Sequence, residues 1–316
     1  MHDPIASVII LTFNHEKYIE DAIDSVLKQK TSYSFEIIIA DDCSTDSTPV
    51  ILSKYQELYP DKIKVIQNKI NVGPVKNYIQ AFRECRGEYI AHCEGDDFWI
   101  YENKLEMQIN FLHANPGYGL IHTGVNRLKN GVYIENINID VDRNLLEGSI
   151  FEHIVNPENY IVHTVTAVMR KNIVEEFFDF SIALSQEWQL LDLPLWATIA
   201  YYSKVKYYPK PTACYRILRE SLSHSRNHMK MRMFHESVAK VREYLISEYG
   251  ITGVLKIQIC RSIYLTKLYD LLLTREYHNF LTELKSILNY DLTFIQYIIL
   301  IKSCIKSYII SLRFKN

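Results

Sequence analysis

Short apolar runs alternate with amphipathic segments along the first 128 residues of the chain. Four of these runs are expected strands and cover 7–12, 35–40, 63–66 and 89–92. Such runs are typical of strands that are buried on both faces. Because helical patterns separate them, the order predicts an α/β fold with a mostly parallel, doubly wound sheet.

Helical spacing of apolar residues fills the gaps between these runs and recurs later in the chain. The expected helices cover about 18–27, 50–58, 75–86, 103–113 and 188–200. Asn14 is a candidate N-cap for the first of these helices. Gly87 is a candidate C-terminal cap for the third.

Beyond residue 128 the pattern is less regular. Asn130-Gly131 is a hairpin signal between two β-like runs. Short strands are expected at 205–208 and 212–215, and after Ser223 the pattern is helical to the end of the chain. We therefore expect an α/β region that gives way to a helical region near residues 220–230.

Polar side chains cluster at strand ends or in the loops beyond them. Thr12-Phe13-Asn14 follows the first strand, Asp41-Asp42 the second and Glu94 to Asp97 the fourth. Ligands bind at the carboxyl ends of the strands in open parallel sheets, so these clusters are candidates for a ligand site. Taken alone, Asp41-Asp42 is more typical of a solvated turn that caps a helix.

The amino-acid composition limits which classes of protein and of binding partner are expected. The 316 residues are 48% hydrophobic, enough for a sizeable core, and the formal net charge of −2 gives no reason to expect a nucleic-acid partner. The six cysteines lack metal-ligand spacing, so reduced thiols are expected rather than a disulfide framework or a zinc site. With neither a signal-peptide pattern nor an apolar stretch of spanning length, we expect a cytoplasmic protein.

Four segments together resemble the N-terminal half of the inverting GT-A glycosyltransferases of family 2. They are Ser7 to Asn14, Ile37 to Asp46, Asn71-Val72-Gly73, and Gly87-Glu88-Tyr89-Ile90 leading into Glu94-Gly95-Asp96-Asp97. Their order and spacing match the family throughout residues 7–99. The ordered set is specific, whereas any one segment alone would be weak support.

The resemblance implies a division of the chain. We expect a GT-A catalytic domain over 1–224, with a donor-binding half at about 1–128 and an acceptor half at about 129–224. A helical C-terminal region would follow over 225–316.

The resemblance also implies which residues hold the nucleoside of a sugar-nucleotide donor. Thr12, Phe13 and Asn14 would contact the nucleoside, with Phe13 stacked on the base. Asp42 would accept a hydrogen bond from the imide N–H of a uracil, and Asp41 would assist.

The donor diphosphate would be held by a cation and a metal ion. Lys76, beyond the Asn71-Val72-Gly73 loop, is the candidate cation, and a plain surface lysine is the alternative. In the resembled motif, Asp96 and Asp97 would bind Mn²⁺ or Mg²⁺, with Asp96 close to the donor as well. Carboxylate oxygens suit both ions, and the bound ion would neutralise charge on the departing diphosphate. Glu94 stands where family members commonly have Asp.

An inverting transfer needs a carboxylate that deprotonates the acceptor hydroxyl. In the family this carboxylate lies at a helix start, which matches the segment 186–196. Asp192 is the candidate base because Asp192-Leu193-Pro194-Leu195 resembles an Asp-x-Pro-Leu variant of the family. Glu187 is the second candidate. The alternative for Asp192 is a helix cap, since Pro194 fits a first helical turn.

Near the end of the expected catalytic domain, Tyr215-Arg216-Ile217-Leu218 resembles the Tyr-Arg-x-His segment of the family. Leu218 replaces the histidine. His224 and His228 are the nearby candidates to substitute for it, and an ordinary surface role is the alternative for both.

The expected function is a metal-dependent, inverting transfer of sugar from a nucleoside diphosphate donor. The donor is expected to be a UDP-sugar, and the acceptor a glycan or lipid-linked molecule in bacterial cell-surface polysaccharide synthesis. A non-catalytic sugar-nucleotide-binding or scaffold protein of the same fold is the alternative, kept open by Glu94 and Leu218. The segment 11–16 contains no glycine, which argues against a nucleotidyltransferase and a dinucleotide dehydrogenase.

The last part of the chain combines apolar residues with basic ones. Residues 292–312 are largely apolar, interrupted by Lys302 and Lys306 and followed by Arg313. This pattern is compatible with a peripheral contact on the inner face of the membrane. A helix packed on the catalytic domain or in a dimer interface is the more ordinary interpretation.

Overall fold

The computed structural model describes residues 3–134, 146–159, 161–218, 227–274, 276, 278–280 and 282–283. The chain divides into two compact units, Met1–Ile217 and Leu218–Asn316. The first contains a sheet with helices around it, and the described part of the second is helical.

A mixed sheet forms the centre of the first unit. Its strands are β1 (Ala6–Thr12), β2 (Phe35–Asp41), β3 (Ile63–Gln67), β4 (Tyr89–His92), β5 (Phe98–Trp99), β6 (Tyr118–Lys129), β7 (Val132–Ile134), β8 (Val168–Arg170) and β9 (Lys204–Arg216). Their order is β3-β2-β1-β4-β8-β6-β9-β5, with β7 paired to β6. The first four strands of this order run parallel, as do β6 and β9, while β8, β5 and β7 pair antiparallel.

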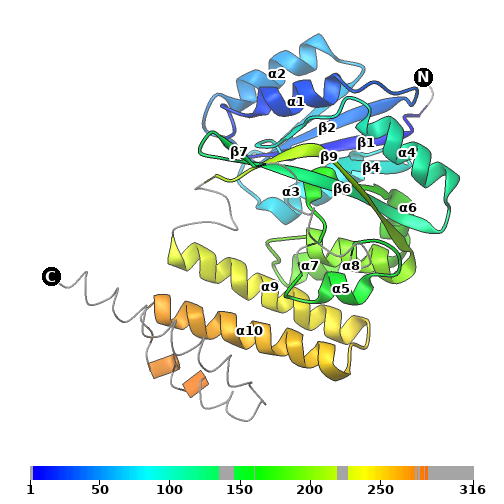
Figure 1. The fold of residues 1–316 in the computed structure, drawn as a ribbon. Helices are drawn as coiled ribbons and strands as arrows, with labels where there is room; N and C mark the ends of the chain where they lie inside the picture. Colours follow the sequence, from blue (N-terminus) through cyan, green and yellow to red (C-terminus); the bar gives the residue numbers. More distant parts are fainter. Residues whose placement is uncertain are drawn as a thin grey trace. The chain divides into compact units, whose positions relative to one another are not determined.

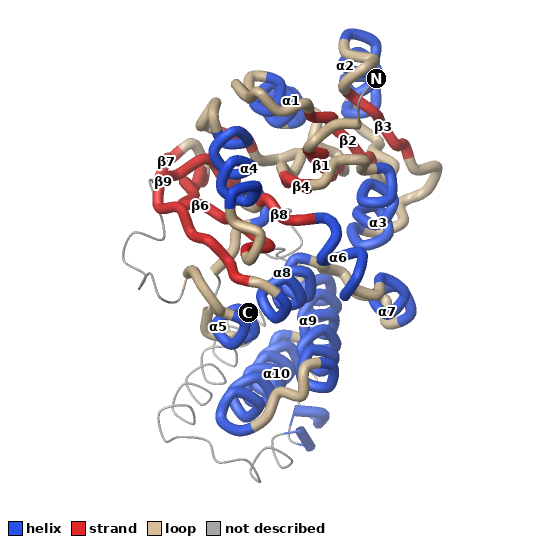
Figure 2. The backbone as a smooth tube through the Cα atoms, turned by 90° about the vertical axis from the view of Figure 1, so that its right-hand side faces the viewer, coloured by secondary structure: helices blue, strands red, loops and turns tan. Residues whose placement is uncertain are grey.

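Helices cover both faces of this sheet (Figure 1). They are α1 (Ile19–Leu27), α2 (Thr48–Leu58), α3 (Pro74–Glu84), α4 (Lys104–Ala114), α5 (Phe151–Val155), α6 (Lys171–Phe177), α7 (Phe180–Ser185) and α8 (Asp192–Tyr202). In both views α1, α2 and α4 lie on one face and α3, α6 and α8 on the other (Figure 2).

The alternation of buried strand residues explains this layering. Val8 and Ile10 of β1 are fully buried and belong to the same apolar cluster as Ile23 of α1 and Leu105 of α4. Ile9 is also almost completely buried, and successive side chains of a strand point to opposite faces. A strand that is apolar at every position therefore needs helices on both sides, as the sequence pattern predicts.

The α/β fold class and the early strand–helix order are confirmed, and some local predictions are wrong. Asn14 does not cap α1, which begins at Ile19 with Tyr18 as its N-cap. The third helix ends at Glu84 with Cys85 as its C-cap, so Gly87 does not cap it. A glycine is needed at 87 for another reason: a Cβ there would lie 2.5 Å from the backbone of Ala6.

Two predictions in the second half of this unit also need correction. The two expected strands are one strand, β9, which continues through Pro209 and Pro211. Its ladder with β6 shifts register between Thr123 and Gly124, and this irregularity accommodates the prolines. The predicted helix over 188–200 begins at Asp192, so the candidate base is its first residue.

The described part of the second unit contains two long helices, α9 (His228–Glu248) and α10 (Gly253–Leu273). Leu268, Leu271 and Leu272 form a small apolar cluster with Phe280. None of the helices described is both long and apolar enough to span a membrane. The segment 292–312 and His224 lie outside the described residues.

Candidate active site

The polar clusters that follow three strands lie at one edge of the sheet. Thr12 ends β1 and is the direct partner of Asp41, the last residue of β2. Beyond β4 the chain continues alongside β1, because Cys93 N donates to Ile9 O at 3.0 Å and Gly95 N donates to Leu11 O at 2.8 Å. The segment Glu94–Asp97, called here the acidic turn, therefore stands next to Thr12.

The loops after β1 and β2 are tied together by hydrogen bonds. Asn14 adopts a left-handed conformation with φ 57°. Its backbone N donates to Ser44 Oγ at 2.8 Å, and its side-chain Oδ1 accepts from Thr45 N at 2.8 Å. This explains why Asn14 is unavailable as a helix cap. The two loops form one preorganised surface, from which the ring of Phe13 is 43% exposed.

Asp41 and Asp42 are both buried and have different surroundings. Asp41 accepts hydrogen bonds from the Ser44 hydroxyl and backbone N, and burial raises its pKa. Asp42 accepts from Val72 N at 2.8 Å through Oδ1 and from Gly73 N at 2.9 Å through Oδ2. The carboxylate of Asp42 thus fixes the loop that leads into α3.

Lys76 lies in the first turn of α3, directly after this loop, and is exposed. Gly73 precedes the helix with φ 86°, a conformation that favours glycine. Because Asp42 holds Gly73, the position of the Lys76 backbone depends on the end of β2.

Arg216 at the end of β9 holds the acidic turn from the opposite side. Its backbone N donates to Asp97 Oδ1 at 2.7 Å, and its Nη1 donates to Asp96 O at 2.9 Å. Its Nη2 forms an ion pair with Asp21 of α1. The guanidinium also lies 4.5 Å from the ring centroid of Phe98. Sequence reasoning did not include Arg216 among the site residues, although the Tyr215-Arg216 motif was its signal.

The carboxylates of the acidic turn repel one another. Glu94 Oε2 is buried and has no hydrogen-bond partner among the described residues. Burial, followed by the charges of Asp96 and Asp192, raises the pKa of Glu94 to about 8. Burial and the charges of Asp96 and Glu94 raise the pKa of Asp97 well above its usual range. A site of this kind favours a bound cation, which would relieve the repulsion.

Asp192 is brought to this turn from a distant part of the sequence. It is the first residue of α8, its Oδ1 accepts from Leu193 N at 2.8 Å, and burial raises its pKa. Its charge is one cause of the raised pKa of Glu94. Glu187 lies exposed in the loop before α8 with φ 56°, and no hydrogen bond or ion pair joins its carboxylate to a described residue.

The residues of the acidic turn fit a divalent ion that takes other ligands from its substrate. No group of three or more His, Cys, Asp or Glu side chains with a metal-binding arrangement occurs in the described part of the chain. Asp96 is partly exposed, and Asp97 uses Oδ1 for Arg216, which leaves Oδ2. Mg²⁺-type sites commonly use one or two carboxylates together with substrate phosphates and water, so this donor set is sufficient.

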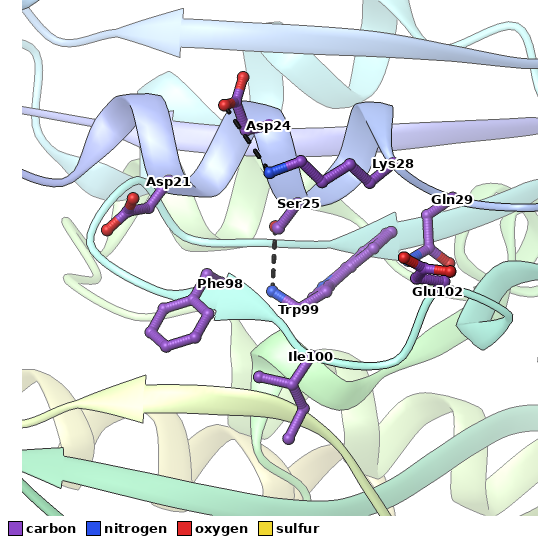
Figure 3. A pocket seen from close by; sticks show the side chains of 9 residues that line it. All are labelled: Asp21, Asp24, Ser25, Lys28, Gln29, Phe98, Trp99, Ile100 and Glu102. Atoms are coloured by element: carbon purple, nitrogen blue, oxygen red, sulfur yellow. Dashed lines mark hydrogen bonds and ion pairs between the residues drawn. The ribbon is translucent and has the colours of Figure 1, made fainter.

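A surface cavity of about 330 Å³ lies between α1 and β5 (Figure 3). Lys28 pairs with Asp24 along its α1 side, and Ser25 Oγ accepts a hydrogen bond from Trp99 N. The residues that line it include none of the predicted site residues. The candidate active site is therefore defined by the strand ends rather than by this cavity.

Residues 7–178 match the family described as Glycosyl transferase family 2, which is more than half of the chain. The chain belongs to this family. The match includes the loops after β1 and β2, the loop before α3 and the acidic turn, and it ends before Asp192. The resemblance found in the sequence is thus confirmed.

Several members of the family are similar in sequence. An uncharacterized protein of Mycobacterium tuberculosis is 40% identical over 110 residues, which is 35% of this chain and 32% of the relative. TuaG of Bacillus subtilis, named as a candidate teichuronic acid biosynthesis glycosyltransferase, is 38% identical over 109 residues, 34% of this chain and 42% of TuaG. An uncharacterized glycosyltransferase of Haemophilus influenzae is 26% identical over 287 residues, 84% of this chain and 80% of the relative. The chain thus spans about a third of the length of the mycobacterial relative.

Solved structures share the fold. TarS 1-349 of S. aureus, in complex with UDP-GlcNAc, has a TM-score of 0.53 at 17% identity and covers 88% of each chain. A mannosyltransferase of Pyrobaculum calidifontis, in complex with GDP-Man and Mn²⁺, has a TM-score of 0.52 at 15% identity and covers 100% of this chain and 89% of that one. These likenesses bear out the GT-A fold.

Proposed function

We propose that this family 2 protein is a metal-dependent, inverting glycosyltransferase that uses a nucleoside diphosphate sugar, with UDP as the nucleotide. The observation that carries the proposal is that the charge of Asp192 acts on Glu94 of the acidic turn, at the edge of the sheet where β1 and β2 end. We propose that a nucleotide surface, an ion site and a base lie together there, as a displacement at a sugar carbon requires.

The surface formed by the loops after β1 and β2 is proposed to hold the nucleoside. Phe13 is exposed there and would stack on the base, with Thr12 and Asn14 beside it. Asp42 would accept from the uracil imide through Oδ2, which has one protein donor while Oδ1 has two. Asp41 would act through Ser44, which it holds in place.

The acidic turn is proposed to hold the ion and, through it, the diphosphate. Asp96 and Asp97 would supply the carboxylate oxygens, and Lys76 would reach the phosphates from α3. A divalent ion bound there would neutralise charge on the leaving diphosphate. The support from relatives is that one fold neighbour is a complex with UDP-GlcNAc and another a complex with GDP-Man and Mn²⁺.

Asp192 is proposed to be the general base, with Glu187 as the second candidate. The acceptor oxygen would attack the anomeric carbon while the bond from that carbon to the diphosphate breaks, and the acceptor proton would pass to Asp192. Because burial raises the pKa of Asp192, its carboxylate is a stronger base than a solvated aspartate. The exposed position of Glu187 makes it the weaker candidate.

The acceptor is proposed to be a glycan or lipid-linked molecule of bacterial cell-surface polysaccharide synthesis, with the protein in the cytoplasm or on the inner face of the membrane. The name of TuaG supports this class of acceptor. A non-catalytic role is not favoured. Burial raises the pKa values of Glu94, Asp97 and Asp192, and carboxyl groups with shifted pKa values cluster at functional sites.

The test is UDP release from a panel of UDP-sugars by the native chain, Asp192→Asn and Glu187→Gln. We expect Asp192→Asn to lower kcat by roughly a hundredfold or more while UDP still binds with native affinity. Glu187→Gln should retain nearly native activity.

The same assay gives the outcomes that contradict the proposal. Full activity of Asp192→Asn would remove Asp192 as the base. A loss in Glu187→Gln alone would transfer the role to Glu187. Once an acceptor is found, retention of the anomeric configuration in the product would exclude the single displacement.

A further inference from the structure

Lys104, the first residue of α4, is a fully buried lysine with 0% exposure. Lysine is almost never fully buried unless its charge is paired. Among the described residues, no carboxylate lies within 4.0 Å of its Nζ. The protein thus keeps a costly cation in its interior, and the neighbours of Lys104 indicate why.

The Lys104 ammonium is held by two side chains. Its Nζ donates to Gln108 Oε1 at 2.7 Å, and it lies 4.3 Å from the ring centroid of Trp99. Gln108 is buried as well, and its Nε2 donates to Ile121 O at 3.1 Å and to Thr166 O at 2.9 Å. One turn of α4 is thereby fixed to β6 and to the segment that precedes β8.

Trp99 carries this connection to the strand that leads into the acidic turn. Its Nε1 donates to His92 O at 3.2 Å and to Val165 O at 3.1 Å. His92 is the last residue of β4, two positions before Glu94. The Lys104, Gln108 and Trp99 side chains are called here the buried brace. It contacts the chain at His92, two positions before the acidic turn, and includes Trp99, two positions after it.

The charge of Lys104 faces the same turn. Burial is the main cause that lowers the pKa of Lys104 to about 7, and interactions with Cys93 and Glu94 oppose this shift. In its protonated form, Lys104 therefore attracts the ionised carboxylate of Glu94.

We propose that Lys104 is a positioning residue that holds the acidic turn in the geometry needed to bind the ion and the donor diphosphate. The inference rests on the proposed function. Lys104 contacts neither donor nor ion and acts through the backbone of residues 92–99. The side chains around ion-binding residues commonly affect affinity or activity by about ten- to a hundredfold.

The test is Lys104→Met in the full chain, because methionine has a similar length and removes the ammonium. Replacing a buried charge by an apolar residue of similar volume is often neutral or stabilising. We therefore expect a Tm equal to or above the native one. We also expect UDP affinity with Mn²⁺ to fall about tenfold, while UDP affinity without Mn²⁺ stays native.

Leu112→Ala is the matched control, since Leu112 is a fully buried residue of the same helix. It should lower Tm and leave the Mn²⁺-dependent part of UDP binding unchanged. A merely structural role for Lys104 predicts that both variants lose affinity in proportion to their loss of Tm, and that result would overturn the proposal.

Two other outcomes also overturn it. Unchanged Mn²⁺-dependent binding in Lys104→Met would show that the turn keeps its geometry without the brace. Tighter binding would show that the ammonium only repels the ion. If the native chain itself binds no nucleotide, with or without Mn²⁺, the proposed function fails and this inference falls with it.

Discussion

At positions 87 and 95 a residue without a Cβ is needed, because neighbouring atoms occupy the space that a Cβ would fill. A Cβ at Gly87 would lie 2.5 Å from Ser7 N, and its own N donates to Ser7 Oγ at 2.9 Å. A Cβ at Gly95 would lie 2.9 Å from Thr12 Oγ1 and 2.8 Å from His15 Nδ1. Both glycines let a segment that flanks β4 approach β1 closely. Gly95 thereby sets the distance between the acidic turn and the nucleoside loops.

Gly87→Ala is expected to destabilise the protein by about 1–3 kcal/mol, the usual effect of overpacking. The clash is with backbone atoms, which cannot rotate away. Gly117→Ala is the control, because a Cβ there meets nothing within 4 Å. Urea unfolding of both variants measures the difference. Equal stability of the two would contradict the packing seen at Gly87.

Some residues could not be placed from sequence because their environment is formed by distant parts of the chain. Lys104 begins a helix, where a lysine is ordinarily solvated, and is buried with its ammonium over the ring of Trp99, a contact that no pattern in the sequence displays. Asparagine commonly caps helices, but the side chain of Asn14 instead accepts a hydrogen bond from Thr45 N in the neighbouring loop.

At the scale of elements, the acidic turn links stability to pH. Burial raises the pKa values of Glu94, Asp97 and Asp192 in the folded state. These three carboxyl groups therefore bind protons more tightly in the folded protein than in the unfolded chain. The stability contributed by Glu94 is fully present below its ordinary pKa of 4.5 and is lost as the pH rises through about 8.

We expect Glu94 to contribute a falling slope to the Tm of the metal-free protein as the pH rises from about 5 to about 8, while His92, His122, His163 and Lys104, whose pKa values burial lowers, contribute in the opposite direction. Glu94→Gln should remove this contribution of Glu94, so the slopes of the two proteins should differ by the equivalent of up to about one bound proton. Differential scanning calorimetry across this range measures both proteins, with Glu187→Gln as the control because that carboxylate is exposed. Parallel slopes for Glu94→Gln and the native chain would show that Glu94 is ionised normally.

Longer strands and helices with a regular apolar pattern were easier to predict from the sequence than short ones. The first four strands are mostly apolar runs, so their pattern identifies them. β5 has two residues and β8 three, too few for any periodicity. Pro209 and Pro211 interrupt the pattern of β9, so the sequence predicts two strands. A register shift against β6 allows one strand to continue.

At the scale of the whole molecule, the site depends on chain segments that are far apart in sequence. Parallel strands place Thr12, Asp41 and the acidic turn at one edge, and this part was expected from the strand order. Arg216 and Asp192 stand near that edge because one ends β9 and the other begins α8. The sequence pattern did not predict where these two elements begin and end. For Asp192 the family resemblance supplied what periodicity could not. The roles of these residues stay predictions.

The central claim is a nucleotide site completed by an ion on the acidic turn. Its most direct test is calorimetric titration of the native chain and of Asp96→Ala/Asp97→Ala with UDP, with and without Mn²⁺. GDP and dTDP serve as competitors for the choice of nucleotide. The account predicts UDP binding that Mn²⁺ strengthens in the native chain and not in the variant. Native binding that is indifferent to Mn²⁺, or absent for all three nucleotides, would contradict it.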